Sequence, residues 1–211
     1  MIRTLSHEAA AGAPMPRLLV VDDQPVNIQV LYRVFAADHQ VLMATSGAKA
    51  LEICRETLPD LVLLDVMMPE MDGFEVLRRL KADPQTAHIP VIFVTALDAV
   101  EDETRGLTLG AVDFIGKPIK PAIVRARVLT HLELARARAL LGATLDATAD
   151  GIAVFGTDGS LLGCNQRFAD MWRIPRELVA AGDQMAIMEY IHTSSASDGA
   201  ALALFGAGSA E

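Results

Sequence analysis

Four short apolar runs in this sequence each lead into a side chain suited to metal or phosphoryl chemistry. The runs and the residues that follow them are 18–21 with Asp22 and Asp23, 61–64 with Asp65, 91–94 with Thr95, and 112–115 with Lys117. Three carboxylates that converge need a cation between them, and Mg²⁺ is usually held by one or two carboxylates, a carbonyl and waters. Any one of these residues alone is commonly a loop, strand or surface residue, so the prediction depends on their joint placement.

The same residues suggest a reaction. A carboxylate such as Asp65 can attack phosphorus in line and form an acyl phosphate. Lys117 would then pair with the phosphoryl oxygens as a point charge, and Thr95 would donate its hydroxyl to the same group. We therefore expect a Mg²⁺-dependent phosphoacceptor site with Asp65 as the nucleophile.

The elements that must position these residues follow from the pattern around them. Short continuous apolar runs are typical of strands buried on both faces, and 40–44 is a weaker fifth candidate. Between the runs lie segments with helical length and spacing: 25–36, 46–56, 73–81 and 100–109. The alternation predicts an α/β fold from about 17 to 131, a doubly wound five-stranded parallel sheet with its site at the carboxyl ends of the strands.

Composition limits the partners that we expect. The net charge of -9 disfavours nucleic-acid binding, which depends on clustered Lys and Arg. Hydrophobic residues make up 52% of the chain, yet no uncharged run is long enough to cross a bilayer, so no membrane partner is predicted. Cys54 and Cys164 lie in unrelated contexts, which fits a reducing cytoplasm.

The chain after the predicted sheet has a different organisation. Residues 119–145 form one long helix, whose apolar stripe either packs on the sheet or pairs with a second helix; the stripe comprises Val124, Val128, Leu132, Ala135 and Ala139. Residues 151–155 and 160–164 read as a hairpin with a turn at 156–159, and a helix follows at 165–172. The predicted divisions are a tail at 1–16, a domain at 17–131, the helix at 119–145, a smaller segment at 146–192 and a low-complexity tail at 193–211.

The segment 63–74, Leu-Leu-Asp-Val-Met-Met-Pro-Glu-Met-Asp-Gly-Phe, resembles the phosphoacceptor segment of response regulator receiver domains. The other marks of that family follow in order: Val-Val-Asp-Asp at 20–23, Val-Thr-Ala at 94–96 and Lys-Pro at 117–118. The resemblance implies a flavodoxin-like receiver of two-component signalling, with Asp65 phosphorylated and Asp22 and Asp23 as metal ligands. It also implies that the backbone carbonyl of Met67 completes the Mg²⁺ site.

Further expectations come from the same resemblance. The Lys117–Pro118 peptide should be cis, and Phe114 falls at the family's aromatic switch position, where it would follow Thr95; a plain core Phe is the alternative. The resemblance implies a sensor histidine kinase or phosphotransfer protein as partner. It implies a readout face within 99–127 and a homodimer through the last receiver helices.

Residues 146–155, Asp158-Gly159 and 164–168 resemble the opening of a PAS sensory domain. Too few residues follow for the later PAS strands, so the segment is either part of a longer protein or a degenerate interaction element. We predict no ligand for it.

Two other functions remain open. A phosphatase or phosphotransferase with an aspartyl-phosphate intermediate usually has a second Asp two residues after the nucleophile, and here that residue is Met67. The sequence thus predicts a switch that catalyses only its own phosphorylation and slow dephosphorylation. A receiver and PAS scaffold that is never phosphorylated is the second alternative.

Overall fold

The computed structural model describes residues 15–96, 100–157, 160–181 and 184–195. The chain divides into two compact units, 1–136 and 137–211. The predicted turn residues 158–159, most of the predicted N-terminal tail and nearly all of the C-terminal tail lie outside the described residues, as does the first residue of the predicted readout face, Ala99.

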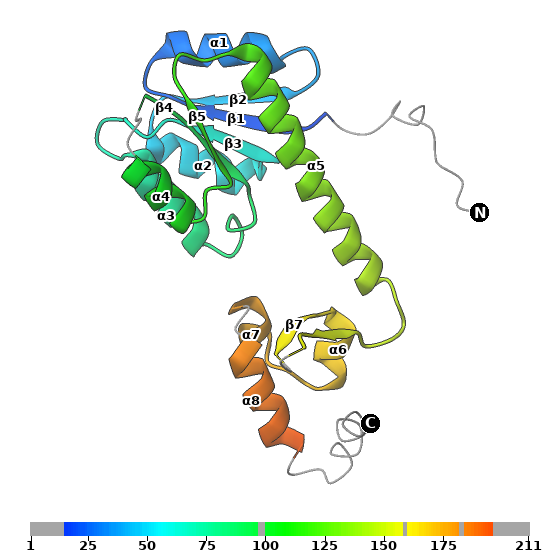
Figure 1. Cartoon of the computed structure of the whole chain (residues 1–211). Coiled ribbons are helices and arrows are strands. Elements are labelled where there is room, and N and C mark those ends of the chain that lie inside the picture. The colour runs from blue at the N-terminus through cyan, green and yellow to red at the C-terminus, as the bar shows by residue number, and fades with distance from the viewer. Residues whose placement is uncertain (1–14, 97–99, 158–159, 182–183, 196–211) are drawn as a thin grey trace, which may run out of the picture. The chain divides into compact units, whose positions relative to one another are not determined.

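The first unit is built on a five-stranded parallel sheet in the order β2-β1-β3-β4-β5 (Figure 1). The strands are β1 (Arg17–Val21), β2 (Gln40–Ala44), β3 (Leu61–Leu64), β4 (Val91–Thr95) and β5 (Asp113–Gly116). All neighbouring pairs are parallel. The predicted strands and the α/β class are therefore confirmed, with β5 one residue later than expected.

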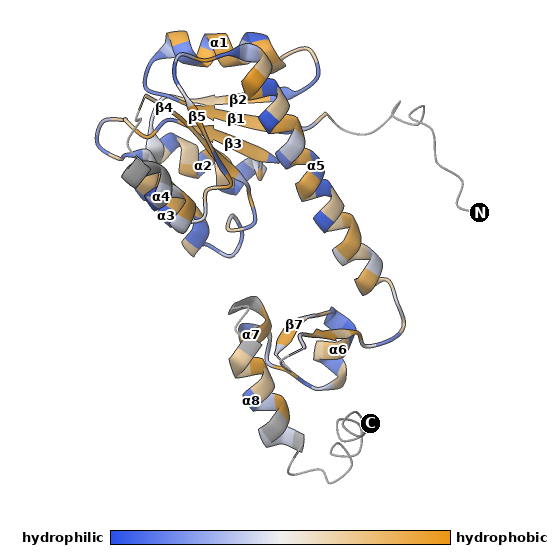
Figure 2. Ribbon diagram, viewed as in Figure 1, coloured by the Kyte–Doolittle hydropathy of each residue, from blue (hydrophilic) through white to orange (hydrophobic). Residues whose placement is uncertain are grey.

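Helices cover both faces of the sheet, as a sheet of continuously apolar strands requires (Figures 1 and 2). They are α1 (Pro25–Phe35), α2 (Gly47–Thr57), α3 (Gly73–Ala82), α4 (Val100–Thr108) and α5 (Pro121–Asp146). Alternate strand residues face opposite layers. Leu18 and Val20 pack in the cluster formed with α1 and α5, whereas Leu19 and Val21 pack in the cluster formed with α2 and α3.

Helix starts are fixed by local signals in the sequence. Pro25 occupies the first turn of α1, where its missing N–H costs nothing. The hydroxyl oxygen of Ser46 accepts a hydrogen bond from the Lys49 N–H, and Asp72 accepts one from the Glu75 N–H. Each cap satisfies an amide that the first helical turn leaves free, and Asp72 places the start of α3 directly after the Asp65 loop.

Only the first part of the α5 stripe packs on the sheet. Val124, Val128 and Leu132 are buried in the core. Ala139 is exposed, and so are Leu134, Leu140 and Leu141, at 46%, 69% and 65% of their surface. The packing alternative is thus confirmed up to Leu132, and beyond it the described part of the helix carries exposed leucines.

The second unit contains the predicted hairpin, with β6 (Ala153–Phe155) antiparallel to β7 (Leu161–Cys164). Helix α6 (Gln166–Met171) follows, capped by Asn165, whose amide oxygen accepts the Phe168 N–H. The helices α7 (Arg176–Ala181) and α8 (Gln184–Ser195) were not predicted. The α8 residues Ile187 and Ile191 close a small core with Phe168 and Leu161.

Both predicted tails overlap the described structure at their inner ends. The carbonyl of Pro16 accepts a hydrogen bond from the Gln40 N–H at 2.9 Å, so this residue of the predicted tail already pairs with the start of β2. Helix α8 runs to Ser195, three residues into the predicted C-terminal tail, because Ile187 and Ile191 bury one face of it. Within the described residues, no helix is both long and apolar enough to span a membrane.

Candidate functional site

The five polar residues singled out from the sequence all lie at the carboxyl ends of neighbouring strands. Asp22 and Asp23 follow β1, Asp65 follows β3, Thr95 ends β4 and Lys117 comes one residue after β5. The strands β1, β3, β4 and β5 are adjacent in the sheet, so parallel pairing brings these ends to one edge. The Lys117 N–H donates to the Thr95 carbonyl at 2.8 Å, which ties the last two ends together.

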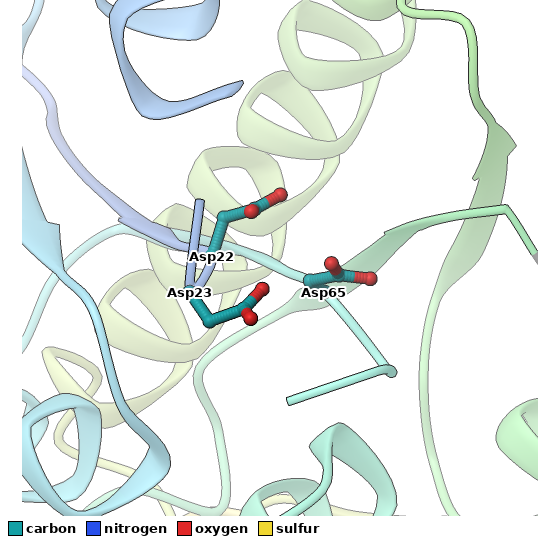
Figure 3. A group of neighbouring side chains, drawn as sticks. All are labelled: Asp22, Asp23 and Asp65. Atoms are coloured by element: carbon teal, nitrogen blue, oxygen red, sulfur yellow. The ribbon is translucent and has the colours of Figure 1, made fainter. Parts of the chain in front are cut away.

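Three carboxylates converge at this edge (Figure 3). Asp22, Asp23 and Asp65 each offer one oxygen, and these oxygens all lie within 4.8 Å of one another. Asp22 and Asp65 are only 2% and 3% exposed. In the part of the chain that the structure describes, Asp23 Oδ1 is a buried oxygen with no hydrogen-bond partner. Buried anionic oxygens so close together, one of them unsatisfied, fit a hard divalent cation such as Mg²⁺.

Lys117 places a positive charge against the carboxylate cluster. Its ammonium group donates to Asp65 Oδ2 at 2.6 Å and to Asp22 Oδ2 at 2.8 Å. Although burial alone would lower the pKa of Lys117, the bonds to Asp22 and Asp65 raise it above its ordinary value. The ammonium therefore stays charged in contact with both carboxylates.

Hydrogen bonds hold Asp65 in place, and burial raises the pKa of its carboxyl group. Its N–H donates to the Val21 carbonyl at 2.8 Å, and its Oδ1 accepts from the Met67 N–H at 3.3 Å. Burial raises the pKa of the Asp65 carboxyl, and Lys117 partly opposes that shift. The side chain of Met67 is exposed, so the backbone of this residue is the part that faces the site.

Gly73 allows the Asp65 loop to pack against the start of α3. A Cβ at this position would lie 2.4 Å from the Asp65 carbonyl oxygen and 2.8 Å from Val66 Cα. The Gly73 N–H also donates to the Val66 carbonyl at 2.9 Å. The absence of a side chain at residue 73 thus permits the close approach of the Asp65 backbone to the start of α3.

Thr95 and Phe114 have different surroundings. Thr95 is fully buried at the end of β4. The Phe114 ring is half-buried, lies 5.0 Å from the Phe93 ring and packs against the core cluster of α2 and α3. The Lys117–Pro118 peptide is cis, as the resemblance implied. In this structure Phe114 is a partly exposed core residue, and a switching role for it stays a prediction.

Sequence reasoning missed one polar contact of the site. The side-chain amide of Asn27 donates to Asp22 Oδ1 at 3.0 Å, next to the Gln24 N–H at 2.9 Å. Asn27 lies inside α1, not at a strand end, so the rule that found the other residues could not include it.

Residues 18–129 match the family model described as "Response regulator receiver domain". The chain belongs to the response regulator receiver family. The receiver is 49% identical over 121 residues to "Response regulator PleD" of Caulobacter vibrioides, a match that covers 56% of this chain and 27% of PleD. It is 40% identical over 106 residues to "Protein PilH" of Pseudomonas aeruginosa, covering 50% of this chain and 88% of PilH. The chain thus spans only about a quarter of PleD and most of PilH.

Solved receivers share the fold. The signal receiver domain of a histidine kinase from Syntrophus aciditrophicus is 36% identical with a TM-score of 0.52, covering 56% of this chain and 90% of that one. The receiver domain of the Francisella response regulator 1452 is 30% identical with a TM-score of 0.53, covering 56% and 97%. The five-stranded flavodoxin-like receiver fold is therefore established for the first unit.

Proposed function

We propose that this chain is a phosphorylation-controlled switch of two-component signalling, in which Asp65 accepts a phosphoryl group from a partner histidine kinase or phosphotransfer protein. The observation that carries the proposal is the buried carboxylate cluster with an unsatisfied Asp23 oxygen, next to an ammonium 2.6 Å from Asp65. A purely structural role would leave that buried oxygen without a purpose.

Asp22, Asp23 and Asp65 would hold Mg²⁺, together with the Met67 carbonyl. The ion would offset the repulsion between the Asp65 carboxylate and the incoming phosphoryl oxygens. An Asp65 oxygen attacks phosphorus in line and a new O–P bond forms. The bond from phosphorus to the donor's imidazole nitrogen breaks, and its electron pair stays on that nitrogen.

The remaining side chains respond to the added charge. Lys117 already contacts Asp65, so after transfer its ammonium can pair with the phosphoryl oxygens. Thr95 would donate its hydroxyl to the same group, and Phe114 would follow it inward. The phosphoryl group would thus shift an existing conformational equilibrium of the readout face within 99–127.

The rest of the chain would carry the signal onward. We place the receiver at 17–131, a linker helix at 119–145 and a partial PAS-like segment at 146–192. The exposed leucines Leu134, Leu140 and Leu141 of α5 favour a homodimer through this helix. We expect a cytoplasmic protein with no nucleic-acid or membrane partner, consistent with its charge of -9.

The test is intact-mass analysis after incubation with Mg²⁺ and a small-molecule phosphodonor. We expect one labile phosphate adduct in the unmodified chain, and none in Asp65→Asn or in EDTA. Asp72→Asn is the matched control, because Asn caps a helix about as well as Asp and Asp72 lies outside the cluster. An unmodified chain that binds Mg²⁺ but never gains the adduct would favour the non-phosphorylated scaffold instead.

A further inference from the structure

The Asp22 carboxylate is held from two sides. Its Oδ1 accepts two hydrogen bonds, from the Gln24 N–H at 2.9 Å and from the Asn27 amide at 3.0 Å. Its Oδ2 accepts one, from Lys117 at 2.8 Å. Since both fixed donors use Oδ1, Oδ2 is the oxygen that can exchange Lys117 for a cation.

Asn27 is the only side chain of α1 among these donors. The Gln24 side chain makes no cap hydrogen bond at the start of α1, and the Asn27 N–H is already used by the Gln24 carbonyl at 3.0 Å. The Asn27 backbone is thus held in the first turn of α1, and its side-chain amide reaches the Asp22 carboxylate at the strand end. It joins the rigid first turn of α1 to a residue of the carboxylate cluster.

We infer that Asn27 is a positioning residue of the cation site: its amide fixes the Asp22 carboxylate so that Oδ2 faces the cation. This rests on the proposed function, since it presupposes that Asp22 binds Mg²⁺. Hydrogen bonds that orient a metal ligand commonly contribute about 10- to 100-fold to metal affinity. With Asp22 only 2% exposed, water can hardly replace the lost amide.

The test is calorimetric titration of Mg²⁺ into the whole chain and into Asn27→Leu. Leu is close to Asn in size and a better helix former, so this variant keeps α1 while it removes the donor. Gln29→Leu is the matched control, because Gln29 is an exposed amide two residues further along the same helix. We expect the dissociation constant for Mg²⁺ to rise at least about 10-fold in Asn27→Leu and to stay unchanged in Gln29→Leu.

Two further readouts distinguish a positioning role of Asn27 from a purely structural one. In EDTA the melting temperature of Asn27→Leu should fall somewhat, because the buried Asp22 carboxylate loses a hydrogen-bond donor. A merely structural residue would show this fall with an unchanged Mg²⁺ affinity, whereas a positioning residue also loses affinity. The phosphate adduct of Asn27→Leu should be restored when Mg²⁺ is raised above its new dissociation constant. Equal Mg²⁺ affinity in both chains would overturn the inference; failure of the unmodified chain to bind Mg²⁺ would instead overturn the proposed function.

Discussion

Replacing Gly73 by Ala should both destabilise the receiver and disturb its site. The added methyl would lie 2.4 Å from the Asp65 carbonyl oxygen, and ordinary contact begins at 3.4 Å, so about 1 Å of retreat is needed. The atoms in the way are backbone, which cannot turn aside as a side chain can. Overpacking of this kind costs about 1–3 kcal/mol, and a loss of about 2 kcal/mol would lower the melting temperature by roughly 6–10 °C.

The control for this change is the same substitution in α5. A Cβ at Gly142 would meet nothing within 4 Å. Gly142→Ala should therefore gain up to about 1 kcal/mol from helix propensity alone. Thermal unfolding followed by circular dichroism, with and without Mg²⁺, measures both variants. A Gly73→Ala chain as stable as its parent, with unchanged Mg²⁺ affinity, would refute the reasoning that this glycine sets the position of Asp65.

Two other predictions concern Asp23 and Cys54. Asp23→Asn should raise the melting temperature in EDTA, because it removes a negative charge from the carboxylate cluster at a residue whose Oδ1 is buried without a partner among the described residues. The same change should abolish the stabilisation by Mg²⁺. Thermal scans check both expectations, and a lower melting temperature in EDTA would count against the cluster as described. Burial raises the pKa of the Cys54 thiol from 9.0 to about 12, so at pH 8 its thiolate should be about 1000-fold scarcer than in an unfolded chain. Alkylation followed by mass spectrometry should modify Cys164 well before Cys54, and equal rates would contradict the burial. Because the pKa of Cys54 is higher in the folded chain than in the unfolded chain, the folded chain keeps the thiol proton at a higher pH. The contribution of Cys54 to stability is therefore complete below pH 9 and is lost as the pH rises through 12.

The sheet and the strand-end residues could be predicted because each depends on local pattern. Fully buried parallel strands read as continuous apolar runs, and the residue that ends each run must lie at the same edge of the sheet. Asp22, Asp65 and Lys117 therefore meet as expected. Val124, Val128 and Leu132 likewise follow one helical face, and all three are buried.

The features that were missed depend on tertiary contacts. Helices α7 and α8 are short or weakly amphipathic, and only the small core around Phe168 shows why their apolar residues are buried. Asn27 looks like an ordinary polar residue on a helix until the distance to Asp22 is known. Gly73 was visible in the motif, but its contact with the Asp65 backbone was not, since that contact joins a strand end to the next helix.

The measurement that tests the central claim most directly is to locate the phosphoryl group on the chain. Hydride reduction converts an aspartyl phosphate into homoserine, which peptide mass spectrometry can assign to one position. After incubation with a phosphodonor we expect homoserine at residue 65 alone, and only when Mg²⁺ was present. Homoserine at another aspartate, or at residue 65 equally in EDTA, would contradict the proposed cation site at Asp22, Asp23 and Asp65.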